Sequence, residues 1–174
     1  LLIDPDRDGY TNHGQLDAFP LDGTEWADSD GDGVGDNADA LPNNASETID
    51  TDSDGIGNNA DTDDDGDTIS DADETASGTN PLLADTDSDG VNDNIDLFPT
   101  DSTETIDTDS DGIGNTADTD DDGDTISDAD ELLTGTNPLV VDSDGDGVND
   151  NIDLFPIDST ETIDTDADGI GNTA

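Results

Sequence analysis

Aspartates recur along this chain at a spacing that could hold a hard cation. The pattern is Asp-x-Asp-x-Asp followed by Gly and then Val or Ile, and it starts at Asp28, Asp50, Asp85, Asp107, Asp142 and Asp164. A variant starts at Asp63 and Asp120, where Thr replaces the Gly. Alternate short Asp side chains on a tightly turning backbone bring three carboxylates to one point, which suits a cation that prefers oxygen ligands.

Numbered as loops of twelve positions, these segments predict oxygen ligands at positions 1, 3, 5, 7, 9 and 12. In residues 28–39, Gly33 stands at position 6, where a sharp turn is needed, and Val34 offers its backbone carbonyl at position 7 while its side chain is expected to pack inward. Calcium loops use this spacing, so we expect a calcium ion in each loop. Magnesium is the alternative, but it requires a small octahedral shell and retains its waters. The predicted metal ligands are Asp28, Asp30, Asp32, Val34, Asp36, Asp39, Asp50, Asp52, Asp54, Ile56, Asn58, Asp61, Asp63, Asp65, Asp67, Ile69, Asp71, Glu74, Asp85, Asp87, Asp89, Val91, Asp93, Asp96, Asp107, Asp109, Asp111, Ile113, Asn115, Asp118, Asp120, Asp122, Asp124, Ile126, Asp128, Glu131, Asp142, Asp144, Asp146, Val148, Asp150, Asp153, Asp164, Asp166 and Asp168.

Position 12 separates two classes of complete loop. Loops that end in Glu, which can bind an ion through both oxygens, are 63–74 and 120–131. Loops that end in the shorter Asp are 28–39, 50–61, 85–96, 107–118 and 142–153. Because Asp61 closes one loop just before Asp63 opens the next, ions in successive loops are expected to lie close together. Whether an ion binds the degenerate N-terminal segment is left open; its residues are Asp4, Asp6, Asp8, Gly9, Tyr10, Asn12 and Gln15.

The loops belong to a tandem duplication. Residues 50–106 and 107–163 align without a gap and differ at nine of 57 positions. A degenerate repeat at 1–27 and a partial repeat at 28–49 precede them, and 164–174 begin another unit. That last unit stops at position 11 of a loop, so we expect either a longer array or a neighbouring chain that completes the site.

Regular secondary structure is expected to be scarce. One short helix is predicted in each full unit, at 71–77 and 128–134, ended by Gly78 or Gly135 in the left-handed conformation. Neither period-2 alternation nor a long 3.6-residue apolar stripe is present elsewhere. The predicted fold class is therefore irregular, an elongated tandem-repeat rod of calcium-stabilised Asp-rich loops that resemble EF-hand loops.

Charge and composition make folding dependent on something besides the polypeptide. The 174 residues include 51 Asp or Glu against one Lys or Arg, for a net charge of -50, and only 27% are hydrophobic. An ordinary domain is roughly 45–50% apolar, so this composition alone is typical of disorder. A disordered acidic tail would, however, scatter its carboxylates, whereas seven complete loops keep them in register. We therefore expect the ion-free chain to expand and metal binding to be coupled to folding.

Not every carboxylate is assigned by the loop pattern. Residues 107–163 contain 18 acidic residues, of which three loops use 14. The unassigned ones are Asp121, Asp130, Asp158 and Glu161. Repulsion among the carboxylates leads us to expect more than one ion in at least some loops.

The chain resembles the thrombospondin type 3 repeats, in the cysteine-free form of bacterial surface proteins. The segments that carry the resemblance are DAFPLDGTEWADSDGDG at 17–33, DSDGDGVGDNAD at 28–39 and DADELLTGTNPLVVDSDGDGVND at 128–150. The resemblance implies a chain wrapped around a string of calcium ions and used as an extracellular stalk or spacer. Disulfide reinforcement cannot be carried over because there is no Cys, and Thr68 and Thr125 depart from the family's glycine.

These observations favour a structural role, as an extracellular or cell-surface rod, stalk or fibre whose main partner is itself. The alternatives are a calcium reservoir, a calcium-dependent adhesive module for a glycan or protein, and a spacer that links unseen domains of a secreted enzyme. Nucleic acid is excluded as a partner and membrane insertion is not expected, since basic clusters and long apolar runs are absent. The chain is not expected to be an enzyme, because His13 and Arg7 have no catalytic companions. Ser and Thr between the ligands are either solvated positions or carriers of a glycan coat.

Overall fold

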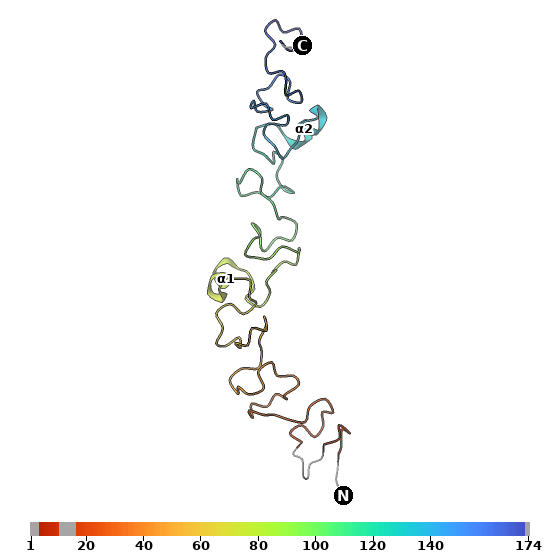
Figure 1. Ribbon diagram of the computed structural model, residues 1–174, viewed down its shortest axis with the longest axis vertical. Helices are drawn as coiled ribbons and strands as arrows, with labels where there is room; N and C mark the ends of the chain where they lie inside the picture. Colours follow the sequence, from red (N-terminus) through yellow and green to blue (C-terminus); the bar gives the residue numbers. More distant parts are fainter. Residues whose placement is uncertain (1–3, 11–16, 173–174) are drawn as a thin grey trace. The chain divides into compact units, whose positions relative to one another are not determined.

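The computed structural model describes residues 4–10 and 17–172. Within these ranges the chain forms two short helices, α1 (Asp71–Ser77) and α2 (Asp128–Thr134), and no strand (Figure 1). Turns, bends and irregular backbone make up the rest of the described chain. The prediction of little regular secondary structure is confirmed, and so are the bounds of both helices.

Each helix is started and stopped by its own neighbours in the sequence. Ser70 is extended (φ -81°, ψ 148°) and its side chain accepts the backbone N–H of Asp73, which caps the first turn of α1. Gly78 ends the helix in the left-handed region (φ 95°) and donates its N–H to the carbonyl of Glu74. Acidic residues in the first turn are favourable at the positive end of the helix dipole. A two-turn helix thus holds Glu74 in a fixed place, and α2 repeats the arrangement.

The described residues contain no buried hydrophobic side chain, and those that are buried are acidic residues or Thr. Ile56 and Ile113, at position 7 of their loops, are 47% and 46% exposed. The prediction that position-7 side chains pack inward is wrong for these two and for Ile170, which is 59% exposed. The described chain has no buried hydrophobic cluster for these side chains to join.

Two compact units divide the chain. The first comprises Leu1–Thr86 with Asn92–Asn94 and includes α1; the second comprises Asp87–Val91 with Ile95–Ala174 and includes α2. Residues of the 85–96 loop thus belong partly to each unit. Neither described helix has the length and hydropathy that a membrane span requires.

Candidate metal centres

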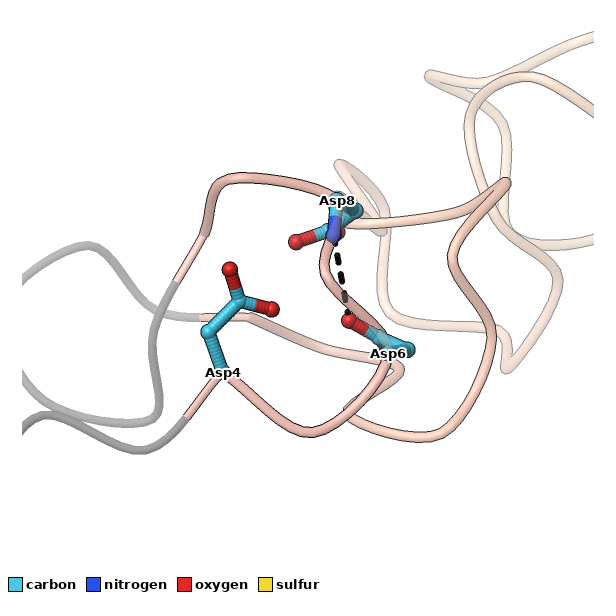
Figure 2. Close-up of side chains that lie close together, drawn as sticks. All are labelled: Asp4, Asp6 and Asp8. Carbon is cyan, nitrogen blue, oxygen red and sulfur yellow. Dashed lines mark hydrogen bonds between the residues drawn. The ribbon is translucent and has the colours of Figure 1, made fainter.

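The aspartates at positions 1, 3 and 5 come together within single loops. In each such group, one oxygen from every carboxylate lies within 4.8 Å of the others. Figure 2 shows this for Asp4, Asp6 and Asp8, which gather around one turn, with the N–H of Asp8 donating to Oδ1 of Asp6 at 3.4 Å. The degenerate segment therefore forms a carboxylate cluster, although Asn12 and Gln15 lie outside the described residues. Equivalent groups are Asp28 with Asp30 and Asp32, Asp50 with Asp52 and Asp54, and Asp63 with Asp65 and Asp67.

Local hydrogen bonds build these groups, as the 142–153 loop illustrates. Asp142 accepts two backbone N–H groups, from Gly145 at Oδ1 (2.8 Å) and from Gly147 at Oδ2 (2.9 Å). Asp144 and Asp146 each accept the N–H two residues further on at Oδ1, at 3.1 and 2.9 Å. The Oδ2 atoms of Asp144 and Asp146 are buried without a hydrogen bond from the described chain. Asp144 and Asp146 thus each use one oxygen to shape the turn and leave the other for a cation.

Glu74 and Glu131 are the most deeply buried side chains of the described chain, with 0% exposure. Neither carboxylate accepts a hydrogen bond at either oxygen from the described residues. Burial, followed by the charges of Asp65 and Asp67, raises the pKa of Glu74 to about 7. Burial, followed by the charges of Asp122 and Asp124, raises the pKa of Glu131 to about 7 in the same way. A buried carboxylate without a donor is costly unless a proton or a cation neutralises it.

Position 12 is also set for a ligand in three of the described loops that end in Asp, 28–39, 85–96 and 142–153. Oδ1 of Asp39 accepts the N–H of Leu41 at 2.8 Å, while its Oδ2 is buried without a partner in the described chain. Asp17 has the same geometry, with Oδ1 bonded to the N–H of Phe19 at 2.9 Å and Oδ2 unpartnered. The loop spacing had pointed to Gln15 for this role in the first segment. The signal that was missed is the apolar-Pro sequence that follows Asp17, as it follows Asp39.

Residues at position 9, which the spacing predicted as ligands, are hydrogen-bonded to position 2 of the same loop. Asp36 accepts the N–H of Ser29 at Oδ1 and its hydroxyl at Oδ2, both at 2.7 Å. Asp150 makes the same pair of bonds with Ser143, at 3.0 and 2.6 Å. These side chains therefore join position 9 of the loop to position 2 by hydrogen bonds, a structural role that the spacing did not indicate.

A second type of carboxylate cluster lies where one loop passes into the next. Asp121 is 9% exposed, and its Oδ1 is buried without a hydrogen bond from the described residues. Burial raises the pKa of Asp121, and the charges of Asp128, Asp118, Glu104 and Asp109 raise it further. Apart from Asp128, these carboxylates form what we call the junction cluster of the second unit. Its counterpart in the first unit consists of Asp64, Asp61 and Asp52.

Sequence reasoning missed the junction clusters because their members come from different loops. Asp121 stands at position 2, outside the ligand pattern, and Asp109 and Asp118 were assigned only to their own loop. A Cβ on Gly123 would lie 2.6 Å from Oδ2 of Asp109. Glycine at this position therefore lets Asp109 of one loop approach the backbone of the next, which is where the two loops meet.

A glutamate three residues before some loops is likewise buried. Glu104 is 6% exposed, and its Oε2 accepts the N–H of Thr116 at 3.0 Å. It occupies the space that a side chain at Gly114 would need, since a Cβ there would lie 2.1 Å from Oε2. The pairing of Glu before the loop with Gly at position 8 is a readable signal that the sequence analysis did not use. The same pairs are Glu25 with Gly35, Glu47 with Gly57, and Glu161 with Gly171.

A scan against protein-family models gives no match to this chain, and a search of curated proteins finds no match either.

Proposed function

We propose that this chain is a calcium-binding structural protein whose loops fold around calcium ions. The observation that carries the proposal is the state of Glu74: it is fully buried, both of its oxygens lack a hydrogen bond from the described chain, and its neighbours Asp65 and Asp67 are also acidic. A divalent cation supplies the positive charge that such a site needs. Calcium fits better than magnesium because it accepts six to eight oxygens in a flexible arrangement.

Charge supports binding at the junction clusters as well as within the loops. Residues 107–163 carry 18 acidic residues and no basic one, so a single ion in each of three loops leaves a charge of -12. An ion at the junction cluster would neutralise two more charges and give the buried Oδ1 of Asp121 a partner. This placement accounts for a carboxylate that the loop pattern leaves without a role.

Ion binding and folding are then a single event. The described chain has no buried apolar side chain, so without cations no hydrophobic core offsets the repulsion of its carboxylates. Circular dichroism and small-angle scattering in millimolar calcium and in excess chelator test this directly. We expect a compact, ordered chain with calcium and an expanded coil with chelator. An unchanged scattering profile in chelator would refute calcium-dependent folding.

The biological role that fits such a chain is an extracellular rod, stalk or fibre, where millimolar calcium fills loops of modest affinity, about 10⁻⁴–10⁻³ M. The near-identity of 50–106 and 107–163 supports it, because arrays lengthen by adding similar units. Electron microscopy of the native material with and without chelator separates the roles. Long regular fibres that fray in chelator favour the fibre, whereas a discrete particle with globular ends favours a spacer. Calcium-dependent capture of a glycan or protein by single chains would favour an adhesive module.

A further inference from the structure

In each complete loop of the described chain that ends in Asp, the residue at position 10 contacts a segment earlier in the sequence. In the 107–118 loop, Thr116 donates its N–H to Oε2 of Glu104 at 3.0 Å and its hydroxyl to the carbonyl of Thr103 at 2.9 Å. Asn37 and Asn59 make the same two contacts in their loops, with N–H distances of 3.1 and 3.0 Å to glutamate. The position-10 residue thus fastens its loop to the chain 12 to 13 residues upstream.

Asn151, at position 10 of the 142–153 loop, forms hydrogen bonds to a different segment of the chain. Its N–H donates to Oδ2 of Asp124 at 3.1 Å, and its side-chain amide donates to the backbone carbonyl of Asp124 and to the hydroxyl of Thr125 at 3.3 Å. These residues are 26 to 27 positions upstream, in the 120–131 loop. Asp124 is 3% exposed and is the position-5 ligand predicted for that loop. Asn151 therefore orients a ligand of a loop to which it does not belong.

Thr125 gives independent support for this contact. It has φ 82°, a left-handed conformation that is unfavourable for a β-branched residue and that glycine occupies in most other loops. Such strain costs on the order of 1–3 kcal/mol and persists where surrounding contacts require it. The hydroxyl of Thr125 is a partner of Asn151 that glycine could not supply. In the first unit, Thr68 (φ 84°) receives the amide of Asn94 in the same way, at 3.3 Å.

We propose that Asn151 is a positioning residue that couples the cation site of the 142–153 loop to that of the 120–131 loop. The inference rests on the proposed function, in which both loops bind calcium. Asn151 lies two residues before Asp153, the position-12 ligand of its own loop, so an ion bound there fixes the Asn151 backbone. The side-chain amide, bound to the carbonyl of Asp124 and the hydroxyl of Thr125, then holds this segment against the loop, so that the N–H keeps Oδ2 of Asp124 in the orientation that its ion requires. By thermodynamic reciprocity, an ion in the 120–131 loop strengthens binding in the 142–153 loop by the same factor.

Hydrogen exchange measured by mass spectrometry across a calcium titration tests the coupling in the full chain. The readout is the calcium concentration that half-protects the peptide 120–133, which Leu132 and Leu133 distinguish by mass from its copy 63–76. Asn151→Ala should raise that concentration about fivefold or more, the lower end of typical coupling strengths. The copy 63–76, held by Asn94, is an internal control and should not shift.

Three further variants make the outcome decisive. Asn149→Ala removes an exposed amide from the same loop and should leave the midpoint of 120–133 unchanged. Asn151→Thr should retain much of the coupling, because the hydroxyl of Thr116, at position 10 of the 107–118 loop, makes the equivalent bond to an upstream carbonyl. Asp144→Asn weakens the 142–153 loop at a ligand and should raise the midpoint of 120–133 through reciprocity, which keeps the test valid even if Asn151→Ala does not fold.

The outcomes separate the two proposals. If wild-type peptides gain no protection with calcium, the proposed function fails and the coupling fails with it. If the wild type responds but Asn151→Ala and Asp144→Asn shift only 142–153, calcium binding stands and the coupling is refuted. An equal loss of protection at 63–76 and 120–133 in Asn151→Ala would also refute it, since a general loss of stability is not a loop-to-loop effect.

Discussion

Replacing Asp121 by Asn changes one carboxylate of the junction cluster into an amide of the same shape. The calcium concentration needed for folding should fall if the cluster holds no ion, and it should rise if the cluster binds one. Asp121 is 9% exposed and senses the charges of Asp128, Asp118, Glu104 and Asp109. A like charge within about 10 Å repels by at least about 0.4 kcal/mol at the dielectric constant of water. Without an ion at the junction, removing one charge would therefore relieve repulsion on the order of 1 kcal/mol, about fivefold in the folding equilibrium.

With an ion at the junction, the same substitution removes a ligand instead of a repulsion. We expect Asp121→Asn to bind one calcium ion fewer than the wild type and to require several-fold more calcium for folding. Native mass spectrometry counts the ions, and circular dichroism during a calcium titration gives the folding midpoint. The junction cluster of the first unit, around Asp64, is unchanged in this variant, so only one ion should be lost.

Asp130→Asn is the matched control. Asp130 is also outside the loop ligand pattern, lies in the same loop as Asp121, and is exposed, so the net charge changes by the same amount without touching the cluster. We expect it to keep the wild-type number of ions. A result in which Asp121→Asn keeps every ion and folds at lower calcium than the wild type would show that the cluster is a site of repulsion and not of binding.

Three further predictions concern single residues. Asp109→Ala should reduce hydrogen-exchange protection in its own loop and in the next, because Asp109 lies against Gly123, while distant loops stay protected; uniform loss along the chain would contradict this. The pKa of Glu131 is raised to about 7 in the fold, so the fold without calcium loses stability as pH rises from about 4.5 through 7; in chelator, circular dichroism should therefore show a more ordered chain at pH 4.5 than at pH 7, and Glu131→Gln should reduce that difference. Gly114→Ala should displace Glu104 from its hydrogen bond and destabilise the folded chain by about 1.5–3 kcal/mol, measured by chemical denaturation in calcium, and an unchanged midpoint would show that Glu104 moves aside without cost.

The sequence by itself determined the parts of this protein that form over a few residues. Asp142 gathers the N–H groups of Gly145 and Gly147, three and five residues away, so alternate aspartates suffice to predict the cluster. The helices were predictable for the same reason, since Ser70 and Gly78 supply the start and stop signals of α1 locally. The low apolar content likewise indicated that no hydrophobic core would form, as the described residues confirm.

Only the tertiary structure decided which residues of different loops meet. Glu104 and Thr116 are 12 residues apart, and Asn151 and Asp124 are 27 apart, distances at which no local turn rule relates two side chains. The burial of Asp121 also depends on how consecutive loops pack, because its neighbours come from both of them. Even at one loop position, spacing does not specify exposure: Val34 is half-buried and Ile56 is exposed, although each donates its N–H to the Asp two residues before it. The spacing of aspartates within a loop specifies where carboxylates can gather, whereas the path of the chain between loops specifies which carboxylates of different loops come close together.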